Sequence, residues 1–140
     1  MKTNQKFLIA FYAFVAIAAF IATFSQNIHV QGGFAGFLDA AKANAGARSL
    51  SVDIALFLEA AAVFMVIEAR RLGMRLVWLY LLGGFLIAIS VTFPLFMIAR
   101  ETLLAPAAKA DAPWSLTTLD LMGLAIVTAL VAAVCWYTLT

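Results

Sequence analysis

The sequence has little of what catalytic and metal centres are usually built from. Its 140 residues include one cysteine and one histidine, and only 11% of the residues are charged. A single cysteine, Cys135, excludes an internal disulfide. The one histidine, His29, has no second histidine or cysteine at ligand spacing, so we expect no metal site. The sequence also lacks a glycine-rich phosphate loop and a nucleophile–base pair, and it predicts no cofactor.

Positive charge is sparse as well. The formal net charge is +2, and no basic tail or stripe of the kind that binds nucleic acid is present. Hydrophobic residues make up 66% of the chain, and the mean hydropathy is +1.05. Soluble domains are about 45–50% apolar and about 25% charged. The composition therefore predicts an integral membrane protein that has the lipid bilayer, and not nucleic acid, as its partner.

Four long apolar runs predict four transmembrane helices in one domain, residues 1–140. The runs are continuous rather than alternating, which favours helices over strands. At about 1.5 Å per residue, each is long enough, with ordinary end effects, to cross a hydrocarbon core of about 30 Å. The predicted spans are residues 7–24, 50–67, 76–99 and 116–139. We expect an all-α, integral membrane four-helix bundle.

The first connection contains a short amphipathic pattern over residues 34–46. Its apolar side chains fall on one helical face: Phe34, Phe37, Leu38, Ala41 and Ala45. This pattern predicts a short interfacial helix that follows the flexible Gly32–Gly33 pair. Such a helix either caps the bundle or covers a cavity as a lid, and the sequence favours the cap.

Glu59 is the main candidate for a ligand-binding site, because it lies near the middle of an apolar run. An ionised acid at that depth costs about 2.5 kcal/mol or more, so its carboxyl group should face protein, water or a ligand. Helical rise places Ser90, Thr92 and Thr128 at a similar depth, and Pro94 should bend the third span beside them. Two interpretations stay open: a hydrogen bond between helices, or a polar anchor for a ligand.

Three further charged residues, Asp53, Arg100 and Asp120, are secondary candidates. In the four-span arrangement, all three lie near the same membrane face. One interpretation is helix capping with interfacial ion pairs, because Thr117 and Asp120 have the spacing of a capping box. The other is a polar vestibule that leads down to Glu59.

Several charged and aromatic positions carry a resemblance to a known family. They are Glu68–Ala69–Arg70–Arg71–Leu72–Gly73, Trp78, Tyr80, Ser90, Phe93–Pro94–Leu95–Phe96 and Arg100–Glu101. From about Phe34 to Glu101 the chain resembles small bacterial membrane proteins grouped as domain of unknown function 2834. The resemblance implies a multi-span protein of the bacterial inner membrane and supplies no catalytic residues.

Charge beside the helix ends predicts the orientation in the membrane. With four spans, both termini lie on the side of the Arg70–Arg75 turn. Five basic residues lie on that side and four on the other, and the five are closer to helix ends. The positive-inside rule then predicts that both termini are cytoplasmic.

Three functional hypotheses follow from these patterns. The first is a structural or accessory subunit, or a small interaction protein, in a larger membrane complex or a homo-oligomer. The second is a binder of a hydrophobic small molecule, such as an isoprenoid or a quinone, with Glu59 as the polar anchor. The third is a membrane isomerase or cyclase, which needs a second polar group near the acid. The sequence favours a role that is not enzymatic.

Overall fold

The computed structural model describes residues 3–104 and 117–139, which form helices and turns and no strand. The elements are α1 (Thr3–Asn27), α2 (Gly33–Ala41), α3 (Ala45–Leu72), α4 (Val77–Gly83), the π-helical η1 (Gly84–Ala88), α5 (Ile89–Leu104) and α6 (Thr118–Leu139). By length and composition alone, three helical stretches are candidates for membrane spans: Gln5–Asn27, Ala45–Leu72 and Val77–Leu104. The prediction of an all-helical protein is confirmed, and these apolar stretches support its membrane location.

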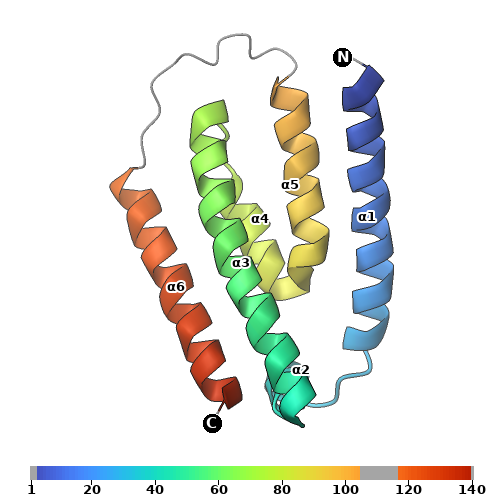
Figure 1. Ribbon diagram of the computed structural model, residues 1–140, viewed down its shortest axis with the longest axis vertical. Helices are drawn as coiled ribbons and strands as arrows, with labels where there is room; N and C mark the ends of the chain where they lie inside the picture. Colours follow the sequence, from blue (N-terminus) through green and yellow to red (C-terminus); the bar gives the residue numbers. More distant parts are fainter. Residues whose placement is uncertain (1–2, 105–116, 140) are drawn as a thin grey trace.

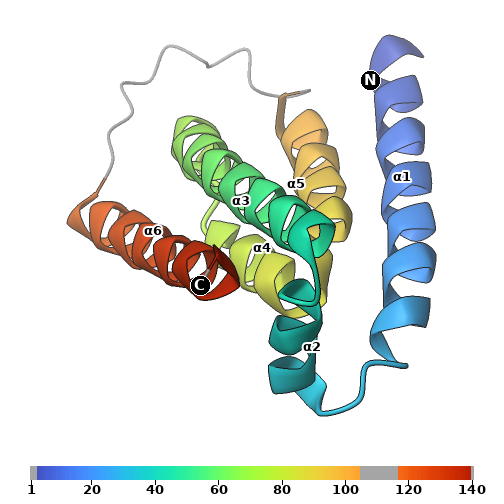
Figure 2. The ribbon, with the colours of Figure 1, turned by 60° about the horizontal axis from the view of Figure 1, so that its bottom comes forward.

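The third predicted span is not a straight helix. Its residues form α4, η1 and α5, and α5 runs back beside α4 (Figures 1 and 2). The rings of Tyr80 in α4 and Phe96 in α5 have centroids 5.8 Å apart. In a straight helix, a separation of 16 residues corresponds to about 24 Å along the axis. The prediction of a single span over residues 76–99 is therefore wrong, because this segment is a helical hairpin.

Two adjacent glycines let the arms of the hairpin approach closely. A Cβ atom at Gly83 would lie 2.8 Å from Cγ2 of Thr92, and one at Gly84 would lie 3.3 Å from Oγ1 of Thr92. The π-helical segment begins at the second of these glycines, and π-helical turns often interrupt regular helices. The chain thus changes direction over residues 84–88, before it reaches Pro94, where we expected the bend.

The hairpin also changes which ends of the helices meet. The N-terminal end of α1 lies beside the C-terminal ends of α3 and α5, whereas α2 and the C-terminal end of α6 lie at the other end (Figure 1). We call the first the arginine-rich end, because it carries Arg70, Arg71, Arg75 and Arg100, and the second the α2 end. The two ends of the described chain are thus at opposite ends of the molecule. This differs from the expectation that both termini lie on one side.

The hydrophobic core lies mainly between α3, α4 and α5. Small and flexible side chains of α3 face the hairpin, including Ala62 and Met65, both fully buried. The hairpin contributes Val77, Leu81 and Phe96. Helix α1 packs on the outside of α5, and its one fully packed apolar side chain among those described is Ala16. This small residue allows the two backbones to approach closely.

Helix α2 lies at one end of the molecule, where it contacts α3 and α6. It is a little shorter than predicted, and none of its described side chains is buried. The Tyr137 hydroxyl, on α6, donates a hydrogen bond of 2.7 Å to Asp39 of α2. The Lys42 ammonium lies 3.9 Å from the centroid of the Tyr137 ring, which is a cation–π geometry. The predicted helix therefore exists, and its place at a membrane interface stays a prediction.

Candidate functional site

The arginine-rich end is built on the C-terminal turn of α3. Gly73 follows the helix with φ 69°, and the amide of Met74 donates a 2.8 Å hydrogen bond to the Ala69 carbonyl. This is a glycine C-cap, in which the left-handed backbone conformation favours glycine. Arg70 and Arg71 lie in the last turn, where positive charge interacts favourably with the helix dipole. The cap fixes the point from which both arginine side chains leave the helix.

Glu68 is the centre of an ion-pair cluster at this end. Its side chain is buried, with 4% of the residue exposed. Oε1 accepts a 2.8 Å hydrogen bond from Nε of Arg100, and Oε2 accepts a 2.9 Å hydrogen bond from Nη1 of Arg71. Arg100 also donates through Nη1 to Oε1 of Glu101, at 2.9 Å. Both oxygens of the buried carboxylate are thus satisfied by guanidinium groups, as a buried charge requires.

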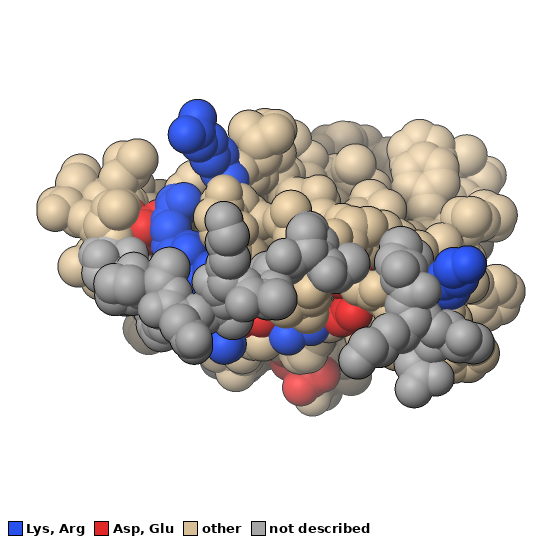
Figure 3. All heavy atoms as spheres, turned by 90° about the horizontal axis from the view of Figure 1, so that it is seen from above, with Lys and Arg blue, Asp and Glu red and all other residues tan. Residues whose placement is uncertain are grey.

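The cluster joins three helices. Glu68 and Arg71 come from α3, and Arg100 and Glu101 come from α5. The side-chain amide of Gln5, on α1, donates to the backbone carbonyl of Glu101. Figure 3 looks onto this end and shows acidic and basic side chains gathered on it. We call the four residues Glu68, Arg71, Arg100 and Glu101 the Glu68 cluster.

A second ion pair attaches α6 to the same end of α3. Arg70 donates from Nε to Oδ2 of Asp120 at 2.6 Å and from Nη2 to Oδ1, so the pair is bidentate. Asp120 is fully buried. Its backbone amide donates to the Thr117 hydroxyl at 3.1 Å, and the Thr117 amide donates to Oδ2 at 2.9 Å. The capping box that the sequence indicated is therefore present, and its carboxylate also binds Arg70.

Glu59 lies near the turn of the hairpin. One of its carboxylate oxygens, Oε2, is buried. The neighbouring Leu58 contacts the turn, because a Cβ atom at Gly84 would lie 3.4 Å from its Cδ1. Thr92 is buried against the same glycines and donates a long 3.4 Å hydrogen bond to the Ala88 carbonyl. Glu59 therefore follows directly after a residue that contacts the glycine turn, and Thr92 packs against the same turn.

The other predicted site residues are not gathered around Glu59. Ser90 is exposed, and the side chain of Thr128 lies outside the described part of the structure. Asp53 is exposed on the part of α3 nearer the α2 end, about 25 Å of helical rise from Arg70. Arg100 and Asp120 lie at the arginine-rich end, in the two separate ion-pair groups. Asp53, Arg100 and Asp120 therefore do not form a common vestibule.

Sequence reasoning missed the Glu68 cluster. Glu68 and Arg71 have the i, i+3 spacing of a helical ion pair, which was the one local signal. Their contact with Arg100 depends on the hairpin, because a straight third span would carry Arg100 to the opposite membrane face. No group of three or more histidine, cysteine, aspartate or glutamate side chains in the described part of the chain is arranged to hold a metal ion.

Comparison with known proteins identifies a family and no individual relative. Residues 8–102, more than half of the chain, match the sequence model of a family described as protein of unknown function DUF2834. No curated protein and no solved structure matches the chain. The matched region contains the hairpin and the whole Glu68 cluster, whereas α6 and its Asp120 follow it. The chain therefore belongs to the DUF2834 family.

Proposed function

We propose that this protein is a small structural or accessory subunit of the bacterial inner membrane that acts through helix–helix association. The charged side chains of the Glu68 cluster bind one another and hold α3 and α5 together, and the side-chain amide of Gln5 attaches α1 to the backbone of Glu101. In this role the cluster sets the relative positions of the helices. The outward face of α1, which is apolar, then provides the contact surface for a partner protein.

The observation that carries this proposal is the exposure of α1. Its outward face is rich in aromatic side chains, and its most exposed large residues are Phe7, Phe11, Phe14, Ile17, Phe20, Ile21 and Phe24. Phe7 stacks on Phe11, and Phe20 stacks on Phe24, at centroid distances of 6.5 and 5.1 Å. Packing drives helix association in membranes, and preformed aromatic ridges offer a regular surface for it. A partner helix along α1 would cover this face.

Site-specific photo-crosslinking in native membranes tests this role. A photoreactive residue at Phe14, which is 69% exposed, should give a protein adduct of discrete mass. An adduct of twice the chain mass would identify a homo-oligomer, and another mass would identify a different subunit. The matched control is Leu56 on α3, which is 56% exposed and should give lipid adducts alone. Lipid adducts alone at both positions would contradict the proposal.

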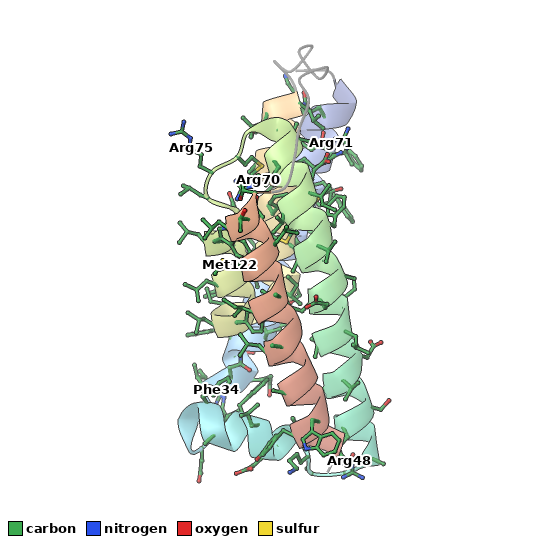
Figure 4. The ribbon with its side chains drawn as sticks, turned by 90° about the vertical axis from the view of Figure 1, so that its left-hand side faces the viewer. Phe34, Arg48, Arg70, Arg71, Arg75 and Met122 are labelled. Carbon is green, nitrogen blue, oxygen red and sulfur yellow. The ribbon has the colours of Figure 1, made fainter. Side chains whose placement is uncertain are left out.

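We further propose that the arginine-rich end faces the cytoplasm. The described basic residues there are Lys6, Arg70, Arg71, Arg75 and Arg100, against Lys42 and Arg48 at the α2 end. Figure 4 labels Arg70, Arg71 and Arg75 at the first end and Arg48 at the second. The hairpin sharpens this asymmetry, because it returns Arg100 to the end that carries Arg70. By the positive-inside rule, the start of α1 is then cytoplasmic and the end of α6 is on the opposite side.

A second candidate function is the binding of a hydrophobic small molecule at Glu59, such as an isoprenoid or a quinone. The observation in its favour is the position of this acid beside the hairpin turn, with Oε2 buried. Irregular backbone within a membrane occurs where it is buried in protein or lines a cavity. A carboxyl group next to such a turn would act as the polar anchor of a largely apolar ligand.

Extraction of bound molecules from the purified protein tests this second function. A specific hydrophobic molecule should remain on the wild-type protein through purification and appear in the mass spectrum of its organic extract. Glu59→Gln should release the molecule, whereas Asp53→Asn, an exposed acid on the same helix, should retain it. Equal retention by both variants would remove Glu59 from the site.

A further inference from the structure

The acidic and basic side chains of the arginine-rich end differ in exposure. All three of its described acids are buried: Glu68 at 4% exposed, Glu101 at 8% and Asp120 at 0%. In contrast, the side chain of Arg71 is 53% exposed, and Arg75 is also exposed. Surrounding molecules therefore meet positive charge at this end, although ion pairs neutralise part of it inside.

Charge also distinguishes the two ends of the molecule. At the arginine-rich end, five basic and three acidic side chains are described, a net charge of +2. At the α2 end, Lys42 and Arg48 are balanced by Asp39 and Asp53. A surface of anionic phospholipid therefore attracts the first end more than the second.

Arg75 precedes an apolar stripe and lies at its arginine-rich end. It lies in the turn between α3 and α4, and Figure 4 shows its side chain pointing away from the helices. Leu76, Leu79 and Leu82 follow it at spacings of three residues and are 63%, 60% and 53% exposed. Leu76 is the N-cap of α4, and residues three apart in a helix lie on one face, so the leucines form a stripe from the cap along α4. A cation above an apolar stripe matches a phospholipid, with its charged headgroup above its acyl chain.

We propose that Arg75 and this leucine stripe form a binding site for an anionic phospholipid. The guanidinium group binds the lipid phosphate, because its planar fork of N–H donors fits two phosphate oxygens. One acyl chain lies along Leu76, Leu79 and Leu82. Arg71 is the less suitable anchor, since its Nη1 is already bound to Glu68 and its side chain points away from Arg75 in Figure 4.

Native mass spectrometry of the full chain in neutral detergent tests the site. Phosphatidylglycerol and phosphatidylcholine with identical acyl chains are added separately, and their dissociation constants are compared. Wild-type protein should prefer phosphatidylglycerol, and Arg75→Gln should reduce this preference about five-fold, the effect of one basic residue near an anionic surface. The matched control, Arg48→Gln at the α2 end, should leave the preference unchanged.

Two further measurements separate a lipid site from a simple anion site. Leu79→Ser should weaken the binding of both lipids by a similar factor, because it removes an acyl-chain contact and no charge. Inorganic phosphate at the lipid concentration should not displace phosphatidylglycerol, because it lacks the acyl chain. Equal binding of the two lipids to wild-type protein would overturn the proposal. So would a loss of lipid preference in Arg48→Gln equal to that in Arg75→Gln, or displacement of phosphatidylglycerol by phosphate.

Discussion

The Glu68 cluster offers a quantitative test of the hairpin, because Glu68 and Arg100 are 32 residues apart in the chain. Glu68→Gln keeps the shape of the side chain and removes its charge. Hydrogen bonds to charged groups contribute about 1.5–3 kcal/mol each when buried, whereas exposed ion pairs contribute about 0–1 kcal/mol. The side chain of Arg100 is 23% exposed and that of Arg71 is 53% exposed. The bond between Arg100 and Glu68 should therefore contribute more to stability than the bond between Arg71 and Glu68.

From these exposures we expect Glu68→Gln to lower the free energy of unfolding by about 2 kcal/mol. In a double-mutant cycle, Glu68→Gln with Arg100→Gln should show a coupling energy of about 1.5 kcal/mol. The same cycle with Arg71→Gln should show about 0.5 kcal/mol, because that arginine is largely solvated.

Unfolding in mixed micelles, with increasing mole fraction of sodium dodecyl sulfate, measures these free energies through helix loss in circular dichroism. The Arg71 cycle is the internal control, since that pair lies within one helix and forms whether or not α5 folds back. A coupling energy near zero between positions 68 and 100, with the Arg71 coupling intact, would refute the hairpin.

Two other substitutions test the attachment of α6 and the packing of the turn. Asp120→Asn should cost about 2–3 kcal/mol in the same unfolding assay, because Arg70 loses a buried bidentate partner; a cost below about 0.5 kcal/mol, typical of an exposed pair, would contradict this contact. Gly83→Ala should cost about 1–3 kcal/mol, because its methyl group meets Cγ2 of Thr92. Thr92→Ser removes that methyl group and should restore most of the loss, whereas two simply additive effects would argue against the contact.

The helices themselves were largely predictable from the sequence. The helices predicted over residues 7–24, 50–67 and 116–139 correspond to α1, α3 and α6, with differences of up to five residues at their ends. Apolar runs of this length have few alternatives in lipid, because every backbone polar group must be satisfied within the segment. The short helix after Gly32–Gly33 could also be predicted from the sequence, because its apolar residues recur at helical spacing.

The hairpin was not predictable, because its hydropathy is that of a single span. Residues 76–99 form one long apolar run, and a straight helix of that length matches the thickness of the hydrocarbon core. Hydropathy therefore does not distinguish a straight helix from a hairpin. The chain folds back where Thr92 packs against Gly83 and Gly84, a contact that depends on tertiary packing. Glycine in a transmembrane helix is common and so did not distinguish the turn from an ordinary helix contact.

The partners of the charged residues followed the hairpin and were missed with it. The capping box of Thr117 and Asp120 was predicted, since it depends on four consecutive residues. The contact of Asp120 with Arg70 was not, because straight spans put these residues on opposite membrane faces. The errors in the candidate site thus came from one wrong assumption about topology. Contacts between residues close in sequence were predicted correctly, whereas contacts that depend on the hairpin were missed.

Sided cysteine labelling tests the hairpin most directly. Arg75→Cys and Leu103→Cys are made separately in a background in which the single native cysteine, Cys135, is replaced by serine. Each is treated with a membrane-impermeant maleimide in intact cells and in inverted membrane vesicles. Because α4 and α5 form a hairpin, both positions should react from the same side. In the orientation that we propose, this is the cytoplasmic side. Reaction of the two positions from opposite sides would mean a straight third span and would contradict the fold described for this protein.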